Sequence, residues 1–279
     1  MRTITLKDGS PEGVVVPVLG QGSWHFGEAG ADRRAEAAAL RLGLDLGMGL
    51  IDTAEMYAEG GAEEVVAEAI AGRRDEVFLV SKVYPHNAGG RRLEAACERS
   101  LGRLKVDRID LYLLHWRGSV PLTDTVQAMQ RMQQAGKIRL WGVSNLDVAD
   151  LEELGDALAD CAADQVLYNL SARGADYDLL PFCRRQGMAL MAYTPLGQGR
   201  LLRQGAVRAV AARHGASPAQ VAISWTLRTP GVISIPKASD AAHVRNNAKA
   251  ATLVLEPADL AELDAAFPPP TRKRSLEML

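Results

Sequence analysis

The chain has 279 residues, of which 47% are hydrophobic and 24% are charged, as in an ordinary globular protein. Its formal net charge of −2 argues against nucleic-acid binding, which usually needs a basic surplus, and against disorder, which needs high net charge and low hydrophobicity. The length is compatible with two domains of about 150 residues or with one α/β barrel of about 250.

The first 13 residues carry charged side chains and no apolar run of the kind found in signal peptides. No apolar run in the sequence approaches the ~20 residues needed to cross a bilayer. Cys97, Cys161 and Cys183 are widely separated and show no CxxC spacing, so neither a disulfide framework nor a thiolate zinc site is predicted. We therefore expect a cytoplasmic protein without a membrane segment.

Short apolar runs of strand length alternate along the chain with longer amphipathic stretches. A hairpin is predicted first, because residues 3–6 and 14–16 flank the turn sequence KDGS. The predicted buried strands then cover residues 18–19, 50–51, 77–80, 109–114, 140–143, 166–168, 188–192 and 232–235. The predicted helices cover residues 33–46, 62–71, 91–104, 123–135, 148–158, 218–227 and 260–266.

The strand candidates follow one another in an unbroken strand-then-helix order, which predicts parallel strands joined by helices. No Ser-, Gly- or Pro-rich linker divides the chain, so we expect a single domain over residues 1–279. The leading prediction is a closed (β/α)8 TIM barrel, with the amino-terminal hairpin across its bottom and a short carboxyl-terminal extension. A doubly wound open sheet is the alternative, because periodicity does not show whether a sheet closes.

Polar side chains follow most of the predicted strands. A closed barrel would gather them on its carboxyl-terminal rim, where barrel enzymes have their active sites. Each residue alone is more commonly a cap, a strand end or a hydrogen-bonded core residue, so only the whole set favours a functional site. The set consists of Asp52, Lys82, His115, Ser144, Asn145, Asn169, Tyr193 and Lys237.

Asp52 and Lys82 can both be buried if they pair, and Tyr57 follows Asp52 closely in the sequence. Such a pair beside a phenol would stabilise the phenolate, so we expect the pKa of Tyr57 to lie below its ordinary value of about 10. Other chemistries have weaker support. The histidines show no HxH or HExxH spacing, and the sequence GVSNL lacks the second glycine of a serine-hydrolase elbow, so no metal site or nucleophilic serine is predicted.

The chain resembles the aldo-keto reductases in segments that run nearly from end to end. They are residues 20–24 (GQGSW), 51–57 (IDTAEMY), 80–82 (VSK), 113–116 (LLHW), 142–145 (GVSN) and 192–197 (AYTPLG). All four catalytic positions of that family occur in order. Within the family, the chain is most similar to bacterial methylglyoxal and aldehyde reductases.

The resemblance implies NADPH-dependent reduction of aldehydes and ketones to alcohols, in which the nicotinamide delivers a hydride to the carbonyl carbon. It implies that Tyr57 is the general acid that protonates the developing alkoxide. Lys82 would keep Tyr57 in a donor state, and Asp52 would neutralise Lys82. His115 would direct the carbonyl oxygen by hydrogen bonding.

The resemblance also implies a cofactor site, in which Ser144, Asn145 and Gln165 hold the nicotinamide carboxamide and Tyr193 stacks on the ring. The family usually has Asn before that Gln, whereas this chain has Asp164. The other implied cofactor contacts are Gly22, Ser23, Trp24, Thr194, Leu196, Gly197, Gln198, Lys237, Ser239, His243, Arg245, Asn246 and Asn247.

Lys237, Ser239 and Arg245 suit the 2′-phosphate, so NADPH is expected over NADH. Many relatives have Arg in the place of His243 and an acid or Gln in the place of Asn246, and this departure leaves the strength of the preference open.

Trp24, His25, Tyr84 and Trp116 are the candidates for the substrate wall. Because little sequence follows residues 260–266, we expect a short carboxyl-terminal loop, an open pocket and broad acceptance of aldehydes, with small 2-oxoaldehydes such as methylglyoxal as candidate substrates.

Two other functions stay open. One is a nicotinamide-binding regulatory or accessory subunit with little turnover, and the other is an alcohol dehydrogenase that uses the same residues in the oxidative direction. The expected partner is a small carbonyl substrate, with neither nucleic acid nor membrane. The sequence does not define the oligomeric state and is compatible with a monomer.

Overall fold

The computed structural model of the chain describes residues 1–10 and 12–279. Within this part of the chain, eight strands form one sheet in the order in which they occur in the sequence, and each pairs in parallel with the next. The strands are β3 (Gln21–Gly22), β4 (Leu50–Asp52), β5 (Phe78–Val83), β6 (Ile109–Leu114), β7 (Ile138–Ser144), β8 (Ala163–Leu167), β9 (Ala189–Tyr193) and β10 (Val232–Ser234).

The sheet closes into a barrel between β3 and β10. Leu19 forms a parallel bridge with Ser234, and Gly22 forms another with Lys237. The backbone N–H of Gly20 donates to the carbonyl of Ser234 at 2.9 Å. A side chain at Gly22 would place its Cβ 2.9 Å from the carbonyl oxygen of Ile235, so this seam requires glycine. The predicted barrel is thus confirmed, and the open doubly wound sheet is wrong because the first and last strands meet.

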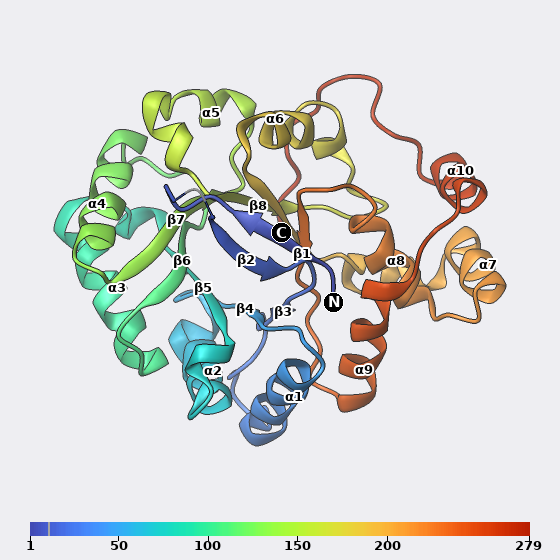
Figure 1. Cartoon of the computed structure of the whole chain (residues 1–279), viewed down its shortest axis with the longest axis horizontal. Coiled ribbons are helices and arrows are strands. Elements are labelled where there is room, and N and C mark those ends of the chain that lie inside the picture. Colours follow the sequence, from blue (N-terminus) through green and yellow to red (C-terminus); the bar gives the residue numbers. More distant parts are fainter. Residues whose placement is uncertain (11) are drawn as a thin grey trace.

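The helices lie around the outside of the sheet, each between two consecutive strands or after the last one (Figure 1). Within the described residues, no helix is both long and apolar enough to span a bilayer. The helices are α1 (Arg33–Asp45), α2 (Gly61–Ile70), α3 (Gly90–Leu104), α4 (Leu122–Gln134), α5 (Val148–Glu152), α6 (Leu179–Gln186), α7 (Gly205–Arg213), α8 (Pro218–Thr226), α9 (Ala241–Lys249) and α10 (Pro257–Ala266).

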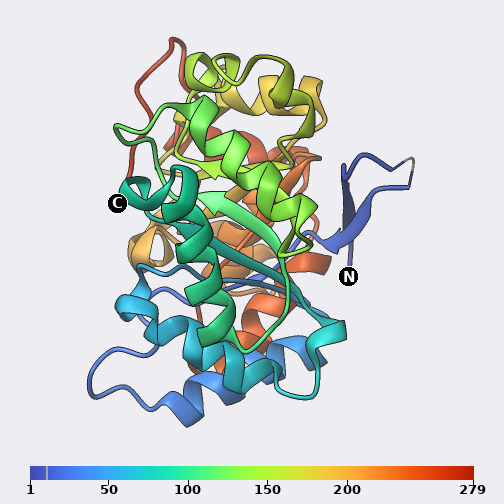
Figure 2. The same cartoon turned by 90° about the vertical axis from the view of Figure 1, so that its left-hand side faces the viewer.

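The amino-terminal hairpin and the carboxyl-terminal tail lie at opposite ends of the barrel (Figure 2). The hairpin consists of the antiparallel strands β1 (Thr3–Leu6) and β2 (Val14–Pro17), as predicted. Its apolar side chains, among them Leu6 and Val16, join the cluster that fills the barrel interior. The hairpin therefore covers the bottom of the barrel and leaves the other end for a functional site.

The barrel interior is packed according to the two-residue period of its strands. On β6, Leu111 and Leu113 belong to the interior cluster, whereas Tyr112 and Leu114 pack with the surrounding helices. Such alternation places one face of every strand inside the barrel. Polar side chains on that face at the carboxyl ends of the strands consequently converge above the apolar interior.

Several elements differ from the predicted ranges: the first barrel strand is Gln21–Gly22 and not residues 18–19, and α6 and α7 were not predicted. The helix predicted for residues 148–158 divides into α5 and a 3-10 turn, Gly155–Asp160, because Gly155 has a left-handed φ of 56°. Strand β8 begins at Ala163, before the predicted start at residue 166. There, the buried polar residues Asp164 and Gln165 interrupt the apolar run that the prediction used.

Candidate active site

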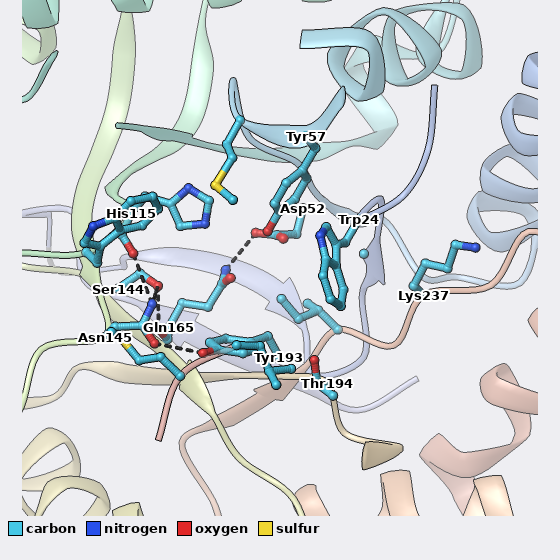
Figure 3. Close-up of a pocket in the computed structure, with 16 residues that line it drawn as sticks. Trp24, Asp52, Tyr57, His115, Ser144, Asn145, Gln165, Tyr193, Thr194 and Lys237 are labelled. Atoms are coloured by element: carbon cyan, nitrogen blue, oxygen red, sulfur yellow. Dashed lines mark hydrogen bonds between the residues drawn. The ribbon is translucent and has the colours of Figure 1, made fainter. Parts of the chain in front are cut away.

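Neighbouring parallel strands bring a set of polar side chains to the end of the barrel opposite the hairpin (Figure 3). The carboxyl ends of these parallel strands lie side by side, so residues far apart in the sequence become neighbours. Along the sheet, the set consists of Asp52 at the end of β4, Lys82 on β5, His115 directly after β6, Ser144 at the end of β7, Gln165 on β8 and Tyr193 at the end of β9.

The ammonium group of Lys82 is completely buried and donates three hydrogen bonds. The acceptors are Asp52 Oδ2 at 2.8 Å, the carbonyl oxygen of Thr53 at 2.8 Å and the hydroxyl oxygen of Tyr57 at 3.0 Å. The other carboxylate oxygen of Asp52 accepts from Gln165 Nε2 at 2.7 Å. Since Tyr57 accepts a hydrogen bond from Lys82, its own O–H hydrogen is left to point elsewhere, and Tyr57 lines the pocket.

Burial and charge oppose each other in this group. Burial raises the pKa of the Asp52 carboxyl, and Lys82 opposes that shift. Burial alone would lower the pKa of Lys82, but the charges of Asp52 and Tyr57 and the hydrogen bonds to both together outweigh it, and the pKa lies above its ordinary value. Burial raises the pKa of Tyr57, because desolvation outweighs the attraction of Lys82 for the phenolate. The expected lowering of the pKa of Tyr57 is therefore wrong, and the hydroxyl keeps its proton at neutral pH.

His115 is a neutral imidazole at the pocket wall. Burial, with a smaller effect from the charge of Lys82, lowers the pKa of His115 to about 2. Within the described residues, its buried Nδ1 has no hydrogen-bond partner. Because an unpaired buried N–H costs more than a bare ring nitrogen, we assign the proton to Nε2. The ring lies edge-on to that of Tyr57, with 5.7 Å between their centroids.

The segment after Tyr57 has an unusual backbone. Ala58, Glu59 and Gly60 follow one another with φ values of 49°, 52° and 93°, all in the left-handed region. Such a conformation costs a residue other than glycine roughly 1–2 kcal/mol. The turn leads directly into α2, so the strain is stored where the chain must place the Tyr57 ring against Lys82 and still enter the helix.

Amide and hydroxyl groups form the wall opposite Tyr57. Ser144 Oγ donates to the carbonyl of Gln165 at 2.6 Å. Asn145 Nδ2 donates to the carbonyl of His115 at 3.1 Å, and Asn145 Oδ1 accepts from the hydroxyl of Tyr193 at 3.0 Å. Burial raises the pKa of Tyr193 to about 12, so this hydroxyl stays a donor. The wall is thus fixed by its own hydrogen bonds.

These side chains surround a pocket of about 260 Å³. Twelve of the residues that line it were predicted as site residues: Gly22, Trp24, Asp52, Tyr57, His115, Trp116, Ser144, Asn145, Gln165, Tyr193, Thr194 and Lys237. Lys82 lies behind Asp52 and Tyr57, where it contacts both.

Four lining residues were not predicted: Met56, Ile235, Met278 and Leu279. Met56 could have been found from its place beside Tyr57, and Ile235 from the end of its predicted strand. The other two have no local signal, because they belong to the tail that returns to the mouth of the barrel. The carboxyl-terminal tail therefore covers one side of the pocket, and the expectation of an open pocket is wrong there.

Several predicted site residues lie outside this pocket. The ring of His25 packs at a tilt of 31° against that of Trp24, with 4.1 Å between their centroids, and Tyr84 packs edge-on against Trp116 at 6.0 Å. Ser23 is completely buried. The predicted nucleotide contacts beyond the pocket lie on two segments: Leu196, Gly197 and Gln198 follow β9, and Ser239, His243, Arg245, Asn246 and Asn247 lie on or just before α9.

On α9 the predicted contacts face different ways. His243 and Arg245 are exposed, whereas Asn247 is buried. Asp240 caps the helix by accepting from the backbone N–H of Ala242 and of His243. Lys237 Nζ lies 3.3 Å from Ser239 Oγ, which places a cation and a hydroxyl side by side at the edge of the pocket.

The comparisons with known proteins agree with this geometry. Residues 18–267 match the model of the Aldo/keto reductase family. The chain is 52% identical to methylglyoxal reductase YeaE of Escherichia coli (strain K12) over 273 residues, which are 95% of this chain and 96% of the relative. It is 35% identical to glyoxal reductase of Bacillus subtilis (strain 168), over 91% of this chain and 90% of the relative. The structure of an aldo/keto reductase from Klebsiella pneumoniae in complex with NADP and acetate has a TM-score of 0.95 and 50% identity, with 99% of each chain covered.

Proposed function

Because the chain belongs to the aldo/keto reductase family, we propose that it reduces small 2-oxoaldehydes such as methylglyoxal to alcohols. The chain is an NADP-dependent oxidoreductase that catalyses NADPH-dependent reduction of carbonyl groups. The observation that carries the proposal is the hydrogen-bonded group in which Lys82 joins Asp52 to Tyr57 at the wall of the pocket.

Tyr57 is the proton donor of the proposed reaction. Its oxygen accepts from Lys82, so the hydroxyl hydrogen is directed to an acceptor other than Lys82. As the hydroxyl gives up its proton to the substrate oxygen, the Lys82 ammonium at 3.0 Å stabilises the phenolate that forms. Asp52 keeps Lys82 charged and in place, and the raised pKa of Lys82 expresses this effect.

His115 orients the carbonyl group. Its imidazole is neutral, because burial lowers its pKa to about 2, and the N–H at Nε2 can donate to the substrate oxygen. A neutral donor cannot compete with Tyr57 as the acid at physiological pH. The two rings therefore divide the work: His115 holds the oxygen, and Tyr57 protonates it.

The pocket fits a nicotinamide nucleotide. Tyr193 offers an aromatic ring, Asn145 and Gln165 offer amides, and Gly22 exposes its backbone in the lining. Lys237 at the opposite edge, beside Ser239, suits a phosphate. When bound, NADPH supplies the hydride, while the residues named here hold its ring and phosphate groups.

The preference for NADPH over NADH rests on Lys237, Ser239 and Arg245, as the sequence suggests. The comparison of kcat/KM for the two cofactors tests it, and we expect the value for NADPH to be higher by about tenfold or more, as loss of one charge-assisted contact of 1.5–3 kcal/mol implies. Equal values would refute the preference.

The proposed substrate class is supported by the methylglyoxal and glyoxal reductases among the relatives and by the flat indole rings of Trp24 and Trp116 in the pocket wall. A compact 2-oxoaldehyde places its aldehyde oxygen between Tyr57 and His115 and its second carbonyl toward the indole rings. The decisive experiment follows NADPH absorbance with purified protein across 2-oxoaldehydes, simple aldehydes, ketones, ketoacids and sugars. The highest kcat/KM is expected for 2-oxoaldehydes, and a higher value for any other class would contradict this assignment.

The accessory-subunit alternative is not favoured, because Asp52, Tyr57, Lys82 and His115 are assembled in one group and the matched relatives are reductases. Binding of NADPH without reduction of any carbonyl in the panel would revive it. We further propose that residues 1–279 act as one domain in the cytoplasm, where the three free, buried cysteines would stay reduced.

A further inference from the structure

Gln165 connects two parts of the site that are far apart in the sequence. Its amide nitrogen donates to Asp52 Oδ1 at 2.7 Å, across the interior of the barrel from β8 to β4. Both side chains are almost completely buried, at 1% and 2% exposure. A hydrogen bond to a buried charge is among the stronger ones in proteins, and its loss is correspondingly costly.

The two oxygens of Asp52 have different donors. Oδ2 accepts from Lys82, and Oδ1 accepts from Gln165. Because an ionised carboxylate can only accept hydrogen bonds, the amide nitrogen of Gln165 must face Asp52, and its carbonyl oxygen Oε1 is turned away. The contact with Asp52 thereby fixes which end of the Gln165 amide faces any ligand in the pocket.

The backbone of the same residue organises the opposite wall. The carbonyl oxygen of Gln165 accepts from Ser144 Oγ at 2.6 Å and from the backbone N–H of Asn145 at 3.0 Å. Asn145 in turn accepts from the hydroxyl of Tyr193. Gln165 thus contacts Asp52 through its side chain, and it contacts Ser144 and Asn145 through its backbone carbonyl.

We propose that Gln165 is a positioning residue that couples the Asp52–Lys82–Tyr57 group to the wall formed by Ser144, Asn145 and Tyr193. This inference rests on the proposed function, because it assigns the coupling to carbonyl reduction. Loss of the amide leaves Asp52 held by Lys82 alone, so the ion pair and the Tyr57 hydroxyl can shift. A displacement of about 1 Å between reacting groups costs about a hundredfold in rate.

Two substitutions test the coupling without touching the backbone. Gln165→Met removes the donor and keeps the approximate length of the side chain. Gln165→Glu sets a second carboxyl group against Asp52, and at this distance two carboxyls share one proton, with one pKa raised. The charged or titratable groups around the contact are Asp52, Tyr57, Lys82, His115 and Tyr193. Asp164→Asn is the matched control for the turnover measurement, because it lies next to Gln165 on β8 and, as successive strand residues alternate, on the other face.

The first measurement is the melting temperature of each protein against pH, without cofactor or substrate. A carboxyl whose pKa is raised by folding stabilises at low pH and loses that contribution as pH rises through the raised pKa. Gln165→Glu should therefore lose about 2–4 °C or more relative to wild type between about pH 5 and about pH 8. Gln165→Met should show no such additional loss. A Gln165→Glu variant whose melting temperature follows that of wild type at every pH would overturn the contact.

The second measurement separates coupling from cofactor binding. Kd for NADPH is taken from fluorescence titration, and kcat is measured at saturating NADPH. We expect Gln165→Met to lower kcat about tenfold or more, and Gln165→Glu to regain kcat as pH falls. A Gln165→Met variant that only weakens NADPH binding, with kcat within about twofold of wild type, would show a cofactor contact without coupling. Absence of carbonyl reduction by the wild type would instead refute the proposed function, and the melting measurements would still decide whether Gln165 holds Asp52.

Discussion

At the scale of single residues, the reaction depends on where one hydrogen atom points. Lys82 uses its three N–H groups on Asp52, Thr53 and Tyr57, so the oxygen of Tyr57 is an acceptor toward the lysine. Tyr57→Phe removes the proton donor and leaves the rest of the pocket in place. We expect kcat for carbonyl reduction to fall about a hundredfold or more, with Kd for NADPH within about twofold of wild type.

Tyr177→Phe is the matched control for this substitution, because Tyr177 is 47% exposed and lies outside the pocket. The measurements are steady-state turnover and NADPH fluorescence titration for both variants. Wild-type turnover by Tyr57→Phe would contradict the assignment of the acid.

Asp164 differs from the Asn that is usual at this position in the resembling family, and it shows what burial does to a carboxyl. It is completely buried, and the backbone N–H of Leu146 offsets only part of the cost of burying its charge. Burial raises its pKa well above the ordinary value. The carboxyl therefore favours the folded state less as pH rises through that raised pKa.

Asp164→Asn cannot ionise, so it should be more stable than wild type by an amount that grows from about pH 5 to about pH 9 and reaches at least about 1 kcal/mol. Urea unfolding of both proteins across this pH range measures the difference. A difference that is the same at every pH would show that Asp164 does not titrate there.

The sequence predicted most of the polar site residues, because the carboxyl ends of parallel strands meet on one rim of a barrel. Asp52, Lys82 and His115 were expected on one rim, and parallel neighbouring strands place them there. The direction of the pKa shift of Tyr57 was wrong, since charge can be counted in a sequence but desolvation cannot. The contact from Gln165 to Asp52 spans the barrel interior, so no local pattern encodes it.

At the scale of elements, the tail over residues 268–279 reaches the pocket although it follows the last strand and helix of the barrel in the sequence. Lys273 Nζ lies 3.2 Å from Asp147 Oδ2 and 3.4 Å from Asp178 Oδ2. Leu276 packs against the outer core, and Met278 lines the pocket. The tail is thus tied to the loops after β7 and β8 before it reaches the mouth of the barrel.

Lys273→Ala should loosen this contact. Exposed ion pairs contribute about 0.2–1 kcal/mol each, so we expect KM for the carbonyl substrate to change about two- to fivefold, with kcat little affected. Added salt should change KM of the wild type in the same direction and leave the variant nearly unaffected, because salt screens the pairs. The control is Arg272→Ala, a neighbouring exposed cation. Equal salt dependence of wild type and Lys273→Ala would contradict this role.

Elements with strong periodicity were predicted closely, and those that depend on tertiary contacts were not. The strand over residues 109–114 agrees with β6, whose side chains are buried on both faces. The helix expected over residues 148–158 ends early at α5, where Gly155 takes a left-handed conformation. The path of the tail depends on Lys273, whose partners lie on other loops and leave no mark on the local sequence.

At the scale of the whole molecule, eight alternating units were enough to predict a barrel. Closure itself was not encoded in any periodicity, because the same pattern also builds an open sheet. It depends on the meeting of β3 and β10, and β3 has only two residues, Gln21–Gly22. The seam needs a glycine at position 22, where the carbonyl of Ile235 approaches too closely for a side chain.

The short seam has a consequence for the motions of the barrel. Gly22, Ile235 and Lys237 belong to the seam and also line the pocket, so a bound dinucleotide would fasten the first strand to the last. At a hundred times its Kd, NADPH should add about 2.7 kcal/mol to the free energy of unfolding. Hydrogen–deuterium exchange should show the added protection concentrated at the backbone amides of Gly20, Gly22 and Ser234, which bridge the seam. Slowing spread evenly over all strands would contradict this. While it is bound, the cofactor would then hold the first and last strands together and reduce opening of the barrel at the seam.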